Sequence, residues 1–154
     1  MSSSAITNGE YSHDYRDWMF VRNEQILSNY PKGSGIPIIL YSCFAGDSSS
    51  TAASLSRDAG AVVYGAQDFA WTRQLRPGVV EAFSAAKDAR GNPGARSSFV
   101  AVGSGSHPFG NAITSIVFDK NTGKATVNYK EVETGSRIPV NKEATVCMDE
   151  KCKK

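Results

Sequence analysis

The chain has 154 residues and a net charge of +2, from 17 Lys and Arg against 15 Asp and Glu. This length fits one domain with a real core, and 40% apolar and 21% charged residues are ordinary for a globular protein. The balanced charge argues against nucleic acid, which favours a clustered basic face. No apolar run is long enough to predict a membrane span, and the Met-Ser-Ser-Ser-Ala start lacks the features of a cleavable signal peptide.

The first half of the chain predicts a β-α-β unit. Residues 1–13, rich in Ser, Asn and Gly, are expected to be flexible, and apolar periodicity predicts a helix over residues 14–30. The continuous apolar run Ile36–Ser42 does not alternate, which predicts a strand covered on both faces, as in a parallel sheet. A helix over 51–59 and a second buried strand over 61–66 complete the unit, with a right-handed crossover.

The second half is less regular. Residues 68–86 are ambiguous: a loop follows the second strand, and residues 79–86 have the pattern of a helix. Residues 87–97 read as a polar loop and 98–102 as a third strand, and the alternating runs within 113–132 flank a Gly-containing turn, a hairpin signal. The sequence therefore predicts a small three-layer α/β fold, a Rossmann-like, mostly parallel sheet with a C-terminal antiparallel hairpin.

A single α/β domain is predicted over residues 14–146, followed by a polar tail, residues 147–154, that contains Cys and Lys. Cys147 and Cys152 lie in this tail, and two interpretations stay open for them: free thiols near solvent, or a small disulfide loop, which requires an oxidising compartment. A zinc site is disfavoured because no second Cys or His pair accompanies them. No metal and no cofactor are expected.

Three chemically active side chains follow the predicted strands. Ligands gather outside the carboxyl ends of strands in open α/β sheets, and Cys43, Asp68 and His107 each come after one predicted strand. Small residues and a helix follow Cys43, so the helix dipole and loop N–H groups favour its thiolate. Cys43 is equally open to a second interpretation, as a small apolar residue in the core.

Each remaining candidate also has an ordinary alternative. His107 is either the general base for Cys43 or a loop residue before a proline. His13 is either that base or a solvated residue in the polar N-terminal segment, since members of a triad need not be close in sequence. Asp68 either orients the histidine or caps a loop, and Trp71 either lines a pocket or packs in the core.

The stretch IILYSCFAGDSSSTAASLSRDAGAVVYGAQDFAW, within residues 36–71, carries a resemblance. It resembles a segment of C-terminal toxin domains of bacterial Rhs and related polymorphic toxins. Its aliphatic-Ser-Cys core is similar to that of caspase-like peptidases of the clostripain and CHAT type. The resemblance implies a caspase-like sheet with Cys43 as nucleophile and a His-Gly pair, carrying the base, at the end of the preceding strand. This chain departs from that pattern, because His13 is followed by Asp14.

The first hypothesis is a cysteine-dependent hydrolase, peptidase- or amidase-like, that acts as a bacterial effector or toxin domain. Cys43 attacks a carbonyl after a histidine takes its proton, with His107 preferred narrowly over His13. The N–H groups of Phe44 and Ala45 hold the oxyanion, and Gly46 belongs to the same pocket.

Two other hypotheses stay open. One is a non-catalytic α/β binding or partner domain in which Cys43 is a core residue. The other is a toxin directed at nucleotides or nucleic acid through Arg73, Arg76 and the turn at residues 103–106, whose signature is binding that weakens steeply with salt. A cognate immunity protein and a larger parent polypeptide are the expected partners. The expected location is that of a secreted or delivered effector without a cleavable signal peptide, and otherwise the cytoplasm.

Overall fold

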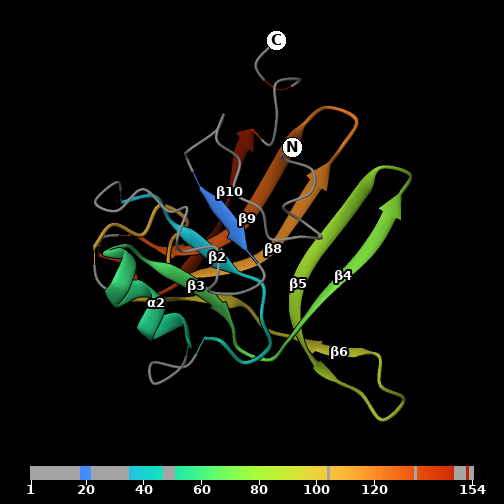
Figure 1. Ribbon diagram of the computed structural model, residues 1–154, viewed down its shortest axis with the longest axis horizontal. Coiled ribbons are helices and arrows are strands. Elements are labelled where there is room, and N and C mark those ends of the chain that lie inside the picture. Colours follow the sequence, from blue (N-terminus) through green and yellow to red (C-terminus); the bar gives the residue numbers. More distant parts are fainter. Residues whose placement is uncertain are drawn as a thin grey trace.

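The computed structural model describes residues 18–21, 35–46, 51–103, 105–133, 135–147 and 152. Within these ranges, ten strands form one mixed sheet and α2 (Thr51–Ala59) packs on it (Figure 1). The expected three-layer, mostly parallel α/β fold is therefore wrong, because most neighbouring strands run antiparallel. No helix in the described ranges has both the length and the apolar character needed to cross a bilayer.

The strands are β1 (Met19–Val21), β2 (Ile38–Leu40), β3 (Val63–Ala66), β4 (Phe69–Arg76), β5 (Val79–Lys87), β6 (Pro93–Arg96), β7 (Phe99–Val102), β8 (Ala112–Asp119), β9 (Lys124–Val132) and β10 (Pro139–Cys147). The main order across the sheet is β1-β2-β3-β7-β8-β5-β4. In addition, β9 pairs with β8 and β10, and β6 pairs with β5.

The predicted β-α-β unit is confirmed. β2 and β3 are parallel, with Ile38 opposite Val63, and α2 connects them. A further parallel strand, β1, lies beside β2. The helix expected over residues 14–30 is therefore wrong at Met19–Val21, and the rest of that segment lies outside the described residues, as does the segment 1–13 that was expected to be flexible.

The region after β3 differs most from the expectation. β7 is a strand, as predicted, but it runs antiparallel to β3, with Val63 opposite Val102. The segment read as a loop and a helix is the hairpin β4–β5, which turns at Pro77-Gly78. β5 lacks alternation because most of it is buried on both faces, and that pattern does not separate a buried strand from a helix.

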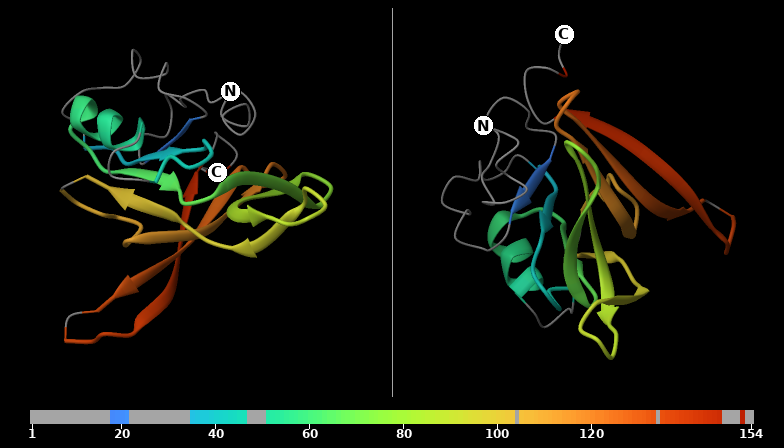
Figure 2. Two further views of the ribbon diagram at one scale, coloured as in Figure 1. Left: turned by 90° about the horizontal axis from the view of Figure 1, so that it is seen from below. Right: turned by 90° about the vertical axis from the view of Figure 1, so that its right-hand side faces the viewer.

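β8 organises the antiparallel half of the sheet. Its first residues pair with β7, its last four pair with β5, and its other edge pairs with β9. The predicted hairpin within residues 113–132 is thus confirmed as β8–β9. In Figure 2 the hairpins β4–β5 and β9–β10 extend away from the rest of the sheet as two diverging arms.

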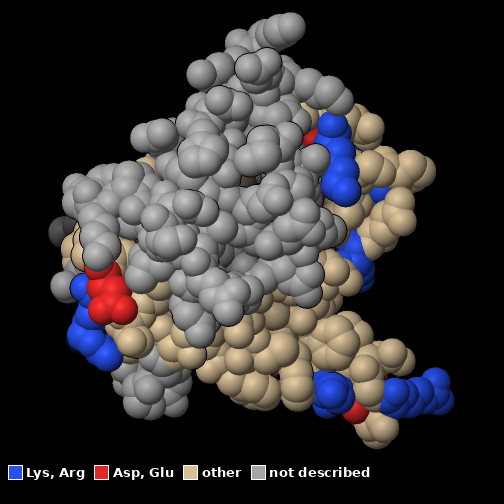
Figure 3. Space-filling model, in the orientation of Figure 1, with Lys and Arg blue, Asp and Glu red and all other residues tan. Residues whose placement is uncertain are grey.

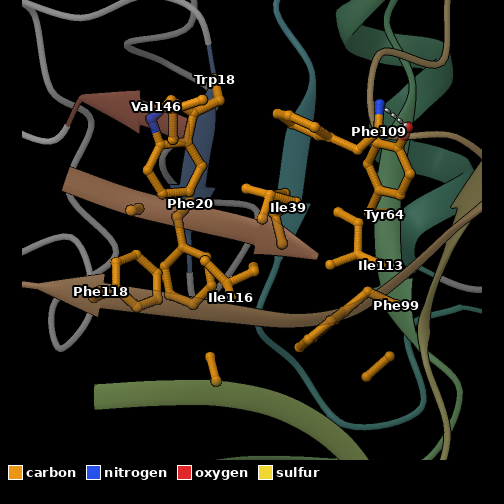
Figure 4. Packing of buried hydrophobic residues seen from close by; sticks show 14 of the residues in the cluster. Trp18, Phe20, Ile39, Tyr64, Phe99, Phe109, Ile113, Ile116, Phe118 and Val146 are labelled. Atoms are coloured by element: carbon orange, nitrogen blue, oxygen red, sulfur yellow. Dashed lines mark hydrogen bonds between the residues drawn. The ribbon is translucent and has the colours of Figure 1, made fainter. Parts of the chain in front are cut away.

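Apolar side chains cover both faces of the central strands. A smaller cluster lies between α2 and one face of β2 and β3. A larger one fills the other face and extends over β8 and β9, and it brings together residues far apart in the sequence, such as Trp18, Phe20 and Phe118 (Figure 4). The rings of Phe20 and Phe118 meet edge to face, with centroids 5.0 Å apart.

One buried hydroxyl ties the loop before β8 to β3. Tyr64 is fully buried, its hydroxyl donates to the carbonyl of Gly110 at 2.8 Å, and it accepts the N–H of Phe109 at 3.0 Å. Burial raises the pKa of Tyr64 above its ordinary value, because the charged phenolate is disfavoured away from water. The hydroxyl therefore stays protonated and keeps both bonds.

We expect Tyr64→Phe to lower the free energy of unfolding by about 1–3 kcal/mol, because it leaves the buried N–H of Phe109 without an acceptor. Urea denaturation measures the change. Tyr129→Phe is the matched control, since Tyr129 packs on Phe109 through its ring. Equal stability of Tyr64→Phe and the wild type would contradict this role.

Candidate functional site

A tight turn carries Cys43 past the end of β2 and onto β3. The N–H of Gly46 donates to the carbonyl of Ala66 at 2.9 Å, and that of Phe44 donates to the carbonyl of Asp68 at 2.8 Å. A Cβ on Gly46 would lie 2.5 Å from the carbonyl oxygen of Gly65, so only glycine permits this approach. Phe44 has a left-handed backbone, with φ of 57°, which is costly for a residue with a Cβ.

The thiol of Cys43 is exposed, so the interpretation of Cys43 as a core residue is wrong. Its Sγ accepts the N–H of Ala70, the second residue of β4, at 3.4 Å. As expected for the ends of two parallel strands, the turn meets Asp68, although it does so through the Asp68 backbone. The Asp68 N–H donates to the hydroxyl of Ser84 at 3.1 Å.

His107 does not join Cys43. β7 runs antiparallel to β3, so His107 lies near the start of β3 and Cys43 near its end. The imidazole lies in its own loop, with Nε2 3.2 Å from the carbonyl oxygen of Gly103 and Nδ1 3.3 Å from Oδ1 of Asn111. His13 is outside the described residues.

The predicted oxyanion donors and the expected His-Gly pair are also not in place. The N–H groups of Phe44 and Gly46 already donate to carbonyls, and Ala45 is 3% exposed. β1 is the strand that precedes the cysteine strand in the sheet, and the next residues in the sequence are Arg22-Asn23, not His-Gly.

Gly103 begins the turn at 103–106 that the nucleotide hypothesis combines with Arg73 and Arg76, and it follows β7 at the end that pairs with the start of β3. The two arginines lie on β4 at the far end of the sheet order. The structure therefore does not bring these two parts of the nucleotide hypothesis together.

A second cluster, which the sequence did not single out as a unit, lies on the outer face of the β4–β5–β6 arm. Glu81 of β5 accepts the Nε–H of Arg73 at 2.8 Å and two N–H groups of Arg96, at 3.1 Å and 3.3 Å. Both guanidinium groups lie over the ring of Phe83, that of Arg96 at 3.7 Å from the centroid and that of Arg73 at 5.8 Å. Two cations, one carboxylate and one buried ring thus form a compact unit.

Aromatic residues extend this cluster. Trp71, Phe83, Arg73 and Arg96 line a hollow of about 550 Å³, and the Trp71 indole N–H donates to the carbonyl of Ala85 at 2.9 Å. On the Cys43 side, Lys87 lies over the ring of Phe69, with Nζ 4.4 Å from the centroid. We call Trp71, Arg73, Phe83, Lys87 and Arg96 the cationic face.

The arm concentrates positive charge. Residues 69–96 contain five Lys and Arg against two Asp and Glu, a net charge of +3, whereas the whole chain carries +2. Figure 3 shows blue Lys and Arg atoms at its lower right, over the β5–β6 region. The alternation of Phe69, Trp71 and Arg73, followed by Pro77-Gly78, is the sequence signal for this face.

The expected tail contains a crosslink. Cys147 and Cys152 form a disulfide, so the disulfide interpretation of the pair is confirmed. The indole N–H of Trp18 donates to the carbonyl of Cys147 at 3.3 Å, which connects this end of β10 to the larger apolar cluster.

Among the described residues, no three His, Cys, Asp or Glu side chains group so that they could hold a metal ion. Comparison with known proteins finds no matching protein family, curated protein or solved structure.

The pKa of Glu81 determines an acid-sensitive part of the stability. Burial alone would raise this pKa, but the bonds from Arg96 and Arg73 outweigh burial and hold it below its ordinary value of 4.5. A carboxyl whose pKa is lower in the folded state stabilises the fold above its unfolded pKa. That contribution is lost as the pH falls through the folded pKa.

We therefore expect Glu81→Gln to lower the free energy of unfolding at pH 7 by about 1–2 kcal/mol, since both arginines are partly exposed to solvent. The difference from the wild type should shrink as the pH falls below 4.5. Denaturation across this range measures it. Glu133→Gln, at an exposed ion pair with Lys142, is the control and should change little. A difference that is constant with pH would contradict the assignment.

Proposed function

We propose that this protein is a binding domain and that its cationic face binds an acidic segment of a partner polypeptide. The observation that carries the proposal is the arrangement of Arg73 and Arg96, whose guanidinium groups flank a single carboxylate over Phe83 and line one hollow. One carboxylate between two guanidinium groups leaves a net positive charge. A carboxylate ligand is therefore attracted to a site whose cations are already fixed in place.

The composition of the face supports a protein partner. Arg, Trp and Phe are the side chains enriched at the centres of protein interfaces. Large apolar side chains next to the face are also open to solvent, with Phe44 52% and Leu75 42% exposed. The arm thus combines the cations that attract an acidic segment with the apolar area that retains it.

The sequence resemblance implies an identity for the partner. A toxin domain of the polymorphic type is an effector, and a cognate immunity protein is the polypeptide expected to bind it. A secreted or delivered location is supported by the disulfide between Cys147 and Cys152, because disulfides persist in oxidising compartments.

The test uses a 15-residue polyglutamate peptide as the probe. We expect the double variant Arg73→Gln, Arg96→Gln to weaken binding at least about tenfold, because both ligand-facing cations are lost. Wild-type binding should weaken as salt is added. Fluorescence anisotropy with labelled peptide gives the dissociation constants.

Arg57→Gln, Arg137→Gln is the matched control, since it removes the same charge from exposed positions outside the arm. Equal weakening in the two double variants would mean that only net charge matters. That result, or no binding of the peptide by the wild type, would overturn the proposal.

A second candidate is hydrolysis with Cys43 as nucleophile. The observation that favours it is the exposed Sγ, held on a left-handed turn at the end of a buried strand and facing the N–H of Ala70. If this candidate holds, expression of the wild type arrests bacterial growth and expression of Cys43→Ala does not. Arrest by both forms at equal expression excludes the thiol as the cause.

A further inference from the structure

The outer edge of β4 has backbone groups that pair with no strand among the described residues. The N–H of Ala70 donates to Sγ of Cys43, so it points away from β5. Ser84, the residue opposite Ala70 on β5, sends its carbonyl to the N–H of Ser97 instead of to β4. Successive residues of a strand direct their backbone groups to opposite edges. Thr72 and Gln74 therefore direct theirs to the same open edge as Ala70.

No strand among the described residues pairs with this edge. β4 is the last strand in the sheet order, and residues 72–76 are all exposed. Figures 1 and 2 show the β4–β5 hairpin as an outer arm of the molecule. Such an edge is a template for another strand.

Two features limit the open edge. At one end Cys43 takes the N–H of Ala70, and at the other a register shift lies between Gln74 and Arg76. The regular open part is therefore short and centred on Thr72–Gln74. It suits a short extended peptide better than a long sheet.

We propose that β4 accepts an extended acidic segment of a partner protein as an added strand, an inference that rests on the proposed function of the cationic face. Residues opposite each other on neighbouring strands place their side chains on the same face. An acidic residue opposite Arg73 thus lies beside the guanidinium, which bonds Glu81 through Nε and keeps its two terminal nitrogens as further donors.

Charge selects this occupant over a second copy of the chain. Pairing of two β4 edges centred on Thr72–Gln74 brings Arg73 of one copy next to Arg73 of the other, and like charges across strands are destabilising. An acidic residue of an added strand, placed opposite Arg73, is attracted instead.

The experiment uses an eight-residue peptide of alternating Thr and Glu, and a second peptide of the same sequence with N-methyl groups on alternate residues. N-methylation removes the N–H groups needed to pair with β4 and keeps the charges. We expect the methylated peptide to bind the wild type at least about tenfold more weakly.

A pair of variants tests the same edge from the protein side. Thr72→Pro removes the N–H that faces the open edge without removing a bond to β5, and proline is tolerated on edge strands. Thr72→Ala keeps that N–H. We expect Thr72→Pro to weaken binding of the plain peptide at least about tenfold and Thr72→Ala by less than about threefold. Circular dichroism confirms the fold of both, and the methylated peptide still tests the proposal if Thr72→Pro does not fold.

The outcomes separate this inference from the proposed function. Equal binding of both peptides, with loss of both in Arg73→Gln, Arg96→Gln, overturns strand addition and leaves the cationic face as an acidic-peptide site. Failure of the wild type to bind either peptide overturns both proposals. Tighter binding of a ten-nucleotide oligothymidylate than of the peptide overturns both in favour of nucleic acid. Dimers that form in sedimentation velocity and disappear in Thr72→Pro assign the edge to a second copy and overturn the proposal.

Discussion

Two strands, β7 and β5, share one edge of β8, and this pairing determines how the arms of the sheet are arranged. β7 pairs with the start of β8 and β5 with its last four residues, while β9 follows the other edge. Because β5 joins β8 only near its end, the β4–β5 hairpin does not continue the β1-β2-β3 part of the sheet and stands apart as an arm. Both the exposed cationic face and the open edge of β4 follow from this single pairing.

Glu81 connects the charged side chains of that arm. Its carboxylate fixes Arg73 and Arg96 over Phe83, and the arginine side chains in turn keep the ring buried on a face that would otherwise be open to water. Because these arginines cover Phe83, β5 is buried on this face as well as on the other, and its sequence does not alternate between apolar and polar residues. The residues that make the arm suitable for binding are also the residues that made it difficult to predict.

The local parts of the fold could be predicted from the sequence, and the long-range pairing could not. Continuous apolar runs identified β2 and β3, and alternation around a glycine turn identified β8–β9. The direction of β7 is not encoded in its four residues, so placing His107 beside Cys43 on the basis of strand order failed. In β5, burial by neighbouring arginines hid the strand, although Pro77-Gly78 marked the turn before it. The exposed Cys43 was placed correctly at the end of its strand, and its expected histidine was not.

The central claim is that the arm binds an acidic peptide through the backbone of β4 as well as through charge. Amide hydrogen exchange, measured residue by residue with and without the Thr-Glu peptide, tests it most directly. The account predicts that the amides of Thr72 and Gln74 exchange more slowly in the complex, because they gain acceptors, while that of Arg73, already directed toward β5, changes little. Unchanged exchange at Thr72 and Gln74 under saturating peptide would contradict it.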